Sequence, residues 1–195
     1  MRFSHCFLAL LLIPFLCTCG ARPNEDTVVS TADSTGMTPA GGNAVDTDQE
    51  GSYAIANGAF LGIKPGEPLA NYTATLRAGL LQTGEGDFDV FYIDGAAGEE
   101  LGYVMPDPND ESKVGDIYLT SPKVRTSAGV HVGMTHARLV EVLGPLEFHG
   151  SEIEGYTSAQ KDGMAYRIDA GNWSYEIDQQ TITPETELIE IVILR

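Results

Sequence analysis

Three histidines, His131, His136 and His149, are the first side chains whose type and spacing could support chemistry. His131 and His136 lie five residues apart across an expected strand-to-helix turn, so their imidazoles could converge on a metal ion. A zinc site would need further ligands at suitable spacing, and the sequence has neither a His-Glu-x-x-His pattern nor a nearby cysteine. We therefore interpret the histidines as structural or exposed, and we predict no metal site.

An oxygen-rich loop follows residues 101–105 and carries the kind of side chain that calcium prefers. Its oxygen donors are Asp107, Asn109, Asp110 and Glu111. Prolines interrupt the loop, and the glycine and the distal glutamate of a calcium-binding loop are missing from their places. The pattern favours a solvated turn over a calcium site.

Motifs for covalent catalysis are not evident in this sequence. It contains no Gly-x-Ser-x-Gly element, and no cysteine lies beyond the first 19 residues. Paired carboxylates such as Asp87 and Asp89 lie two residues apart, which places like charges on one face of a strand and suits solvent better than acid–base catalysis. Gly84-Glu85-Gly86 lacks the lysine of a phosphate-binding loop. We predict a protein that is not an enzyme, with no catalytic residue and no cofactor.

Aromatic residues in the C-terminal part are the remaining candidates for a contact surface or a pocket. Trp173, Tyr175 and Ile177 would share one face of a strand, and Tyr166 would lie on another strand. Aromatic residues at this spacing are often core residues, but they can also line a ligand groove. Tyr166, Trp173 and Tyr175 are therefore the predicted contact or pocket residues.

The elements that would position these side chains are mostly strands. Period-two alternation predicts strands over 88–93, 101–105, 116–120, 164–168, 173–177 and 189–193. The last of these is apolar on nearly both sides, so we expect it inside a sheet. Helices are expected over 68–78, where Pro68 suits the first turn, and over 135–143, where Thr135 is a plausible N-cap. The pattern predicts an α+β fold, a largely antiparallel sheet with about two helices.

A similar approach precedes each expected helix. Gly62-Ile-Lys-Pro-Gly66 leads into the first, and Gly129-Val-His-Val-Gly133 leads into the second. The single domain expected over 51–195 therefore allows two tandem strand-helix-strands repeats, with halves 51–123 and 124–195.

The N-terminal region has the three parts of a secretory signal, namely a charged start, an apolar run over 7–16 and a processing site. The site, Leu16-Cys17-Thr18-Cys19, resembles the lipobox of bacterial lipoproteins. That resemblance implies that residues 1–18 are removed as a signal peptide and that Cys19 carries diacylglycerol and a further acyl chain such as palmitate. The alternative is an ordinary secreted protein that is cut nearby.

Residues 19–50 are predicted to form a lipidated cysteine followed by a tether. The segment is acidic and rich in Ser, Thr and Gly, and it has too few large apolar residues to offset chain entropy, so we expect disorder. Gly20 after the lipidated cysteine implies, by the sorting rule of enteric bacteria, an outer-membrane lipoprotein, which we expect to face the periplasm.

Charge limits the partners. The chain has a formal net charge of −17 and no cluster of lysines and arginines, which argues against a nucleic-acid partner. We expect the membrane to be engaged through the N-terminal lipid, and we expect a protein partner in the envelope.

The C-terminal half resembles a known family. The run Asp116-Ile-Tyr-Leu, the Gly129–Gly133 element with its helix, the segment Met164-Ala-Tyr-Arg-Ile and Gly171-Asn-Trp173 together resemble the sigma-E-regulated outer-membrane lipoproteins of unknown function. The Gly-Met-Thr-helix-Leu-Gly element also looks like the small lipoprotein of the outer-membrane barrel-assembly machinery. Neither resemblance supplies a catalytic residue.

These observations together predict a bacterial envelope lipoprotein that works as a protein-interaction or envelope-maintenance module. Contact would be made through an exposed sheet edge or an apolar patch. The alternative is a periplasmic domain that binds a small ligand, a glycan or a cation in a pocket.

Overall fold

The computed structural model describes residues 53–195, so the predicted signal peptide, Cys19 and the whole tether predicted over 19–50 lie outside the described residues. The described part contains eleven strands in two sheets, one α-helix and two short 3-10 helices. The protein is therefore mostly β, and the predicted α+β class with about two helices is wrong.

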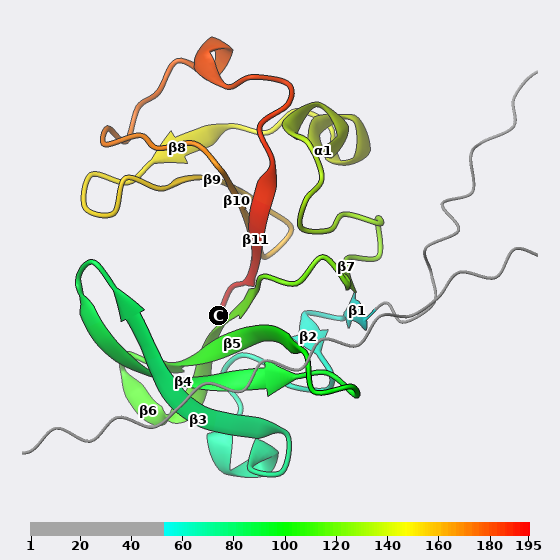
Figure 1. Cartoon of the computed structure of the whole chain (residues 1–195), viewed down its shortest axis with the longest axis vertical. Coiled ribbons are helices and arrows are strands. Elements are labelled where there is room, and N and C mark those ends of the chain that lie inside the picture. The colour runs from blue at the N-terminus through cyan, green and yellow to red at the C-terminus, as the bar shows by residue number, and fades with distance from the viewer. Residues whose placement is uncertain (1–52) are drawn as a thin grey trace, which may run out of the picture. The chain divides into compact units, whose positions relative to one another are not determined.

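The larger sheet has eight antiparallel strands in the order β3-β4-β5-β6-β11-β10-β9-β8. Its strands are β3 (Leu76–Thr83), β4 (Gly86–Asp94), β5 (Glu100–Asp107), β6 (Asp110–Leu119), β8 (Phe148–Gly150), β9 (Thr157–Lys161), β10 (Met164–Ile168) and β11 (Leu188–Ile193). Two four-stranded meanders, β3 to β6 and β8 to β11, meet where β6 pairs with β11 (Figure 1). At this junction Ile191 lies opposite Leu119, and Ile193 lies opposite Ile117.

Several predicted strands are confirmed. Residues 88–93 fall within β4, 101–105 within β5, and 164–168 form β10. The strand predicted over 189–193 falls within β11, which lies inside the sheet between β6 and β10 as its apolar faces indicated.

The helix predicted over 68–78 is wrong. Only Leu69–Tyr72 is helical, as the 3-10 helix η1, and the chain from Leu76 onward belongs to β3. The eight residues of β3 all pair with β4, and this ladder outweighs the weak helical preference of a segment that contains Gly79. The α-helix predicted for the first of two repeats is therefore wrong; the 3-10 helix η1 precedes β3 to β6, whereas α1 precedes β8 to β11.

The helix predicted over 135–143 is confirmed as α1 (His136–Leu143). The Thr135 side chain accepts a hydrogen bond from the backbone N–H of Arg138 at 3.4 Å, which caps the first turn. Gly144 ends the helix with a φ of 79°, a conformation that glycine adopts without steric cost. Leu139 is fully buried and attaches α1 to the core. None of the helices in the described part is long and apolar enough to cross a membrane.

The smaller sheet has the order β2-β1-β7, with β1 (Tyr53–Ala56), β2 (Ala59–Phe60) and β7 (Val124–Arg125). It packs with α1 against one face of the large sheet. The buried core at this contact includes Phe60 from the small sheet, Leu139 from α1, and Leu119 and Ile191 from the large sheet. The opposite face of the large sheet is free of this core, and it carries the candidate site.

Candidate functional site

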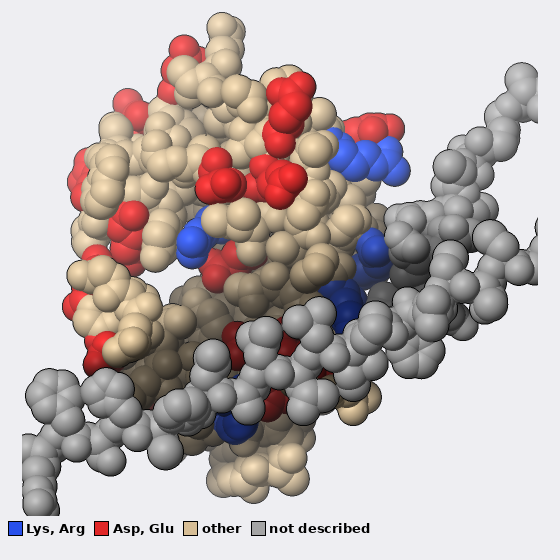
Figure 2. Space-filling model, viewed as in Figure 1, with Lys and Arg blue, Asp and Glu red and all other residues tan. Residues whose placement is uncertain are grey.

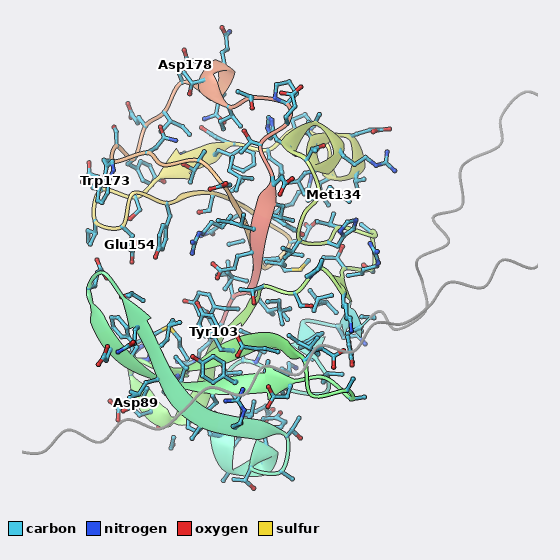
Figure 3. The ribbon with its side chains drawn as sticks, in the orientation of Figure 1. Asp89, Tyr103, Met134, Glu154, Trp173 and Asp178 are labelled. Atoms are coloured by element: carbon cyan, nitrogen blue, oxygen red, sulfur yellow. The ribbon has the colours of Figure 1, made fainter. Side chains whose placement is uncertain are left out.

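The free face of the large sheet borders a cavity of about 450 Å³, which we call the groove. Its lining comes from both ends of the sheet, with Leu81 on β3 at one side and Ser158 on β9 at the other. The sheet must therefore curve so that its two meanders face one space. Figure 2 shows this face hollowed between its upper and lower parts, with acidic side chains on both sides of the opening. In Figure 3, Tyr103 lies on the lower side of that space and Glu154 on the upper side.

A row of tyrosines crosses the first meander on this face. Tyr92 and Tyr103 lie opposite each other on β4 and β5, with ring centroids 6.4 Å apart in an edge-on arrangement. Tyr103 lies opposite Tyr118 of β6, and these two rings stack at 4.8 Å with only 5° between their planes. Burial raises the pKa of both stacked phenols, that of Tyr118 to about 12, so both hydroxyls stay neutral and able to donate hydrogen bonds at physiological pH.

An ion pair lies on the floor of the groove. Arg167 of β10 and Glu190 of β11 are opposite each other across the ladder, and the Arg167 Nη1 lies 3.2 Å from the Glu190 Oε1. Glu190 is only 6% exposed, and the Tyr103 hydroxyl donates to its other carboxylate oxygen at 3.5 Å. The Arg167 guanidinium also lies 3.8 Å from the centre of the Tyr156 ring, within range for a cation–π interaction.

Burial raises the pKa of Glu190 despite the opposing effects of Arg167, whose charge and hydrogen bond both lower it. The ionised carboxylate is therefore less favourable in the folded protein than in water, because desolvation outweighs the ion pair. The ionised Glu190 therefore lowers the free energy of unfolding, which an apolar residue at the same position would not do.

The walls and rim of the groove differ in character. Leu81, Phe88, Met105, Val192 and Leu194 supply apolar surface. Three further carboxylates, those of Glu85, Asp116 and Glu154, also line it. A mostly apolar and aromatic cavity with a few converging polar groups is the usual form of a ligand-binding site.

A nucleophile with a neighbouring base is not found at the groove. The prediction that the sequence holds no motif for covalent catalysis needs one correction, because Ser158 and Lys161 match the Ser-x-x-Lys spacing of some acyl-transfer enzymes. They lie three residues apart on β9, so their side chains point to opposite faces. Ser158 lines the groove, whereas the Lys161 amine donates to the carbonyl oxygen of Leu143.

The three aromatic residues predicted from the sequence lie apart from this floor. Tyr166 is buried on the core face of β10, where its hydroxyl contacts the Met164 sulfur at 3.8 Å. Trp173 is 69% exposed and Tyr175 is 58% exposed. Tyr175 stacks on His149 at 4.5 Å, and both line a shallow cavity beside the groove together with Tyr156.

The strand predicted over 173–177 is wrong. This segment has no regular secondary structure. It passes over the edge strand β8 and forms no ladder with it; the Gly150 N–H donates a hydrogen bond to the Tyr175 carbonyl oxygen. A Cβ on Gly150 would lie 2.2 Å from the carbonyl oxygen of Ser174, so the crossing depends on glycine. The Trp173 ring lies directly over Gly155, where an added Cβ would lie 2.6 Å from a ring atom. Trp173 therefore contacts the loop that carries Glu154 and Tyr156.

His136 and Asp107 of the oxygen-rich loop make contacts within the fold. His136 packs edge-on against Phe148 at 5.3 Å, and within residues 53–195 no three His, Cys, Asp or Glu side chains gather as a metal site would require. Asp107 is not solvated as predicted. It is fully buried, accepts a hydrogen bond from the Asn109 N–H at 2.8 Å, and forms an ion pair with Arg195.

The residues of the groove floor were missed at the sequence level. Glu190 did give a signal, because a carboxylate stands there inside an otherwise apolar strand. Tyr103 and Tyr118 gave none, since their stacking depends on the register between β5 and β6.

Comparisons with known proteins add little. No protein-family model and no curated protein sequence matches the chain. A search of solved structures finds the uncharacterized protein yfeY from Escherichia coli, at 13% sequence identity and a TM-score of 0.47, covering 68% of this chain and 93% of that one. The resemblance to sigma-E-regulated lipoproteins stays a prediction.

Proposed function

We propose that this protein is a non-enzymatic envelope lipoprotein whose groove binds a ligand. The observation that carries the proposal is the ion pair of the buried Glu190 with the half-buried Arg167, on a face of the sheet that the hydrophobic core does not use. The signal sequence and the lipobox-like site at Cys19 support anchoring to the membrane.

The ion pair supports binding because it contributes little to folding. Replacing a buried pair with well-packed apolar residues is often neutral or stabilising. In the groove, by contrast, such a pair together with the hydroxyls of Tyr103 and Tyr118 offers both donors and acceptors to a ligand. The apolar walls would then bury the rest of the ligand, and the polar groups would fix its orientation.

The test is a binding screen with a variant that keeps the shape of the groove. Organic amines, sugars, short peptides and fatty acids would be screened by thermal shift, with Trp173 fluorescence as a second signal, since Trp173 touches the groove loop. Any probe that binds would be titrated again into the double variant Arg167→Leu/Glu190→Leu. We expect at least about a tenfold loss of affinity, as removal of charge-assisted hydrogen bonds predicts.

The matched control is the double variant Arg77→Leu/Asp94→Leu. It removes an exposed, bidentate ion pair, with 2.7 Å between Arg77 Nε and Asp94 Oδ2, that lies outside the groove lining. Binding should be unchanged in this control. A probe that loses affinity equally in both double variants, or in neither, would count against the groove.

A second candidate function is contact with an envelope protein through the edge of the sheet. β3 is an edge strand of eight residues that pairs only with β4 in the described sheet, and it exposes 57% of Leu80. A long edge strand can pair with an extended segment of another protein. Cross-linking in whole envelopes would test this, because a Leu80→Lys variant should lose any product that forms through β3.

A further inference from the structure

A second cavity, of about 440 Å³, lies between β7, the following loop and α1. Its ionisable lining consists of Arg125, His131 and Arg138, and no carboxylate lines it. This is unusual in a chain with 28 acidic and 11 basic residues. The ionisable lining is therefore basic on an acidic protein, with the charge of Arg138 balanced by Glu141 outside the lining, and the cavity shares no lining residue with the groove.

Arg125 has a donor that the protein itself does not use. Its Nε atom is buried and has no hydrogen-bond partner among the described residues. A buried donor without a partner is costly, and guanidinium donors are especially suited to oxyanions. Because Arg125 also lines the cavity, an oxyanion bound there would give its guanidinium an acceptor that the described residues do not supply.

The other basic groups are held in place by neighbouring residues. The Nδ1 of His131 donates to the carbonyl oxygen of Val132 at 3.0 Å, so the Nε2 can donate to an anion only when the ring carries a second proton. Arg138 pairs with Glu141 through Nη1 at 2.7 Å. The backbone N–H groups of the first turn of α1 are already used, since those of His136 and Ala137 donate to Thr186 and Pro184. An anion would thus be held by side chains, without the helix terminus.

We propose that this cavity binds the phosphate group of a phosphate ester. A guanidinium and a protonated imidazole match the negative charge of phosphate and donate to its acceptor oxygens. The cavity is larger than inorganic phosphate needs, and Met134, Val142 and Ala128 give it apolar surface for an organic remainder.

The phosphate could come from a lipid headgroup or from a soluble ester. Ala54 lies opposite Arg125 in the parallel pairing of β1 and β7, so the chain enters the described part of the fold beside this cavity. If Cys19 is lipidated as proposed, the segment leading from the membrane joins the fold next to the cavity. That placement favours the headgroup as the source.

The test uses calorimetric titration of the full-length protein in detergent. The probes are glycerol 3-phosphate, inorganic phosphate and, as the uncharged control, glycerol. We expect glycerol 3-phosphate to bind and glycerol not to bind. Affinity should fall at least about tenfold in Arg125→Gln, with no change in Arg77→Gln, which removes an exposed arginine far from the cavity lining.

Two further measurements complete the test. His131→Gln changes the cavity at another residue, so it tests the site even if Arg125→Gln fails to fold, and it should also weaken binding. Co-sedimentation of a Cys19→Ala variant with phosphatidylcholine vesicles, with and without phosphatidylglycerol, separates the sources. Retention that requires phosphatidylglycerol and Arg125 assigns a lipid headgroup, whereas binding of glycerol 3-phosphate alone assigns a soluble ester. Absence of binding to every phosphate probe, or binding unaffected in both cavity variants, would overturn the proposal.

Discussion

Glu190 is a carboxylate in the middle of the apolar strand β11, and it is the side chain on which the groove depends most. Within residues 53–195 its charged hydrogen-bond partner is Arg167, and its position on the groove face separates it from Ile191 and Ile193, which point into the core. Glu190 therefore belongs both to the central strand β11 and to the proposed binding groove.

The raised pKa of Glu190 makes a prediction about pH. The folded protein holds the Glu190 proton more tightly than the unfolded chain, so the free energy of unfolding should fall as pH rises from the ordinary glutamate range through the raised folded value. A Glu190→Gln variant should lack this component. Urea unfolding over a pH series would measure it, and wild type should gain stability relative to the variant on acidification.

The control for that measurement is Glu185→Gln, because Glu185 is exposed and remote from the groove. Its pH profile should follow that of wild type. Parallel profiles for Glu190→Gln and wild type would show that Glu190 is not desolvated as described.

The sequence predicts the individual residues of the site less well than it predicts the strands and the helix. Alternation correctly assigns Tyr166 to a strand, but it cannot decide between the core and a groove, and Tyr166 lies in the core. The site depends on neighbours across strands, such as Tyr103 with Tyr118 and Arg167 with Glu190. Those pairings follow from register, which no single strand encodes by itself.

The hairpin of β5 and β6 is the element that sets the tyrosine stack. Gly102 approaches β6 so closely that an added Cβ would lie 2.0 Å from the Tyr118 carbonyl oxygen. We predict that Gly102→Ala separates the two strands and destabilises the protein by at least about 2 kcal/mol, as overpacking in a rigid site does. Thermal or urea unfolding would measure this.

Gly84 offers the matched control, since an added Cβ there meets nothing within 4 Å and its φ is not in the left-handed region. Gly84→Ala in the β3–β4 turn should change stability little. Equal effects of the two substitutions would rule out the close approach of β5 and β6 as the cause.

Elements were predicted well where the pattern was long and had clear ends. Thr135 and Gly144 fix the ends of α1, and the apolar faces of β11 place it inside the sheet. The segment 68–78 failed because its spacing also fits a strand, and the partner that decides the matter, β4, comes later in the chain. The segment 173–177 failed because alternation alone does not provide a strand to pair with.

Across the whole molecule, Arg195 connects the chain beyond β11 to the strands β5 and β6. Its backbone N–H donates to Asp116 at 2.9 Å, and its guanidinium pairs with the buried Asp107. We predict that Arg195→Ala lowers the free energy of unfolding by about 2–3 kcal/mol, since it leaves a buried carboxylate unpaired while partial exposure of Arg195 limits the loss. Urea unfolding would measure the change.

A double-mutant cycle with Asp107→Asn identifies the source of that loss. If the unpaired charge is responsible, Arg195→Ala should cost less when Asp107 is already Asn. Additive losses would mean that the two side chains act independently.

Anchoring is also a property of the whole protein, and it rests on the sequence alone. We predict that protein extracted from membranes begins at Cys19 and carries the added mass of its acyl chains, and that Cys19→Ala is recovered unlipidated in the soluble fraction. Intact-mass spectrometry would measure both forms. An unmodified wild-type mass with another N-terminus would replace the lipoprotein with an ordinary secreted protein.

The position of β11 between β6 and β10 also has a consequence for the order in which the chain can fold in the cell. β6 ends at Leu119, and its neighbour β11 begins only at Leu188, so the eight-stranded sheet cannot close until that late segment has left the ribosome. Pairings between such distant segments form slowly. The nascent chain would therefore stay open during synthesis, which is the state that an export channel for unfolded polypeptides can accept.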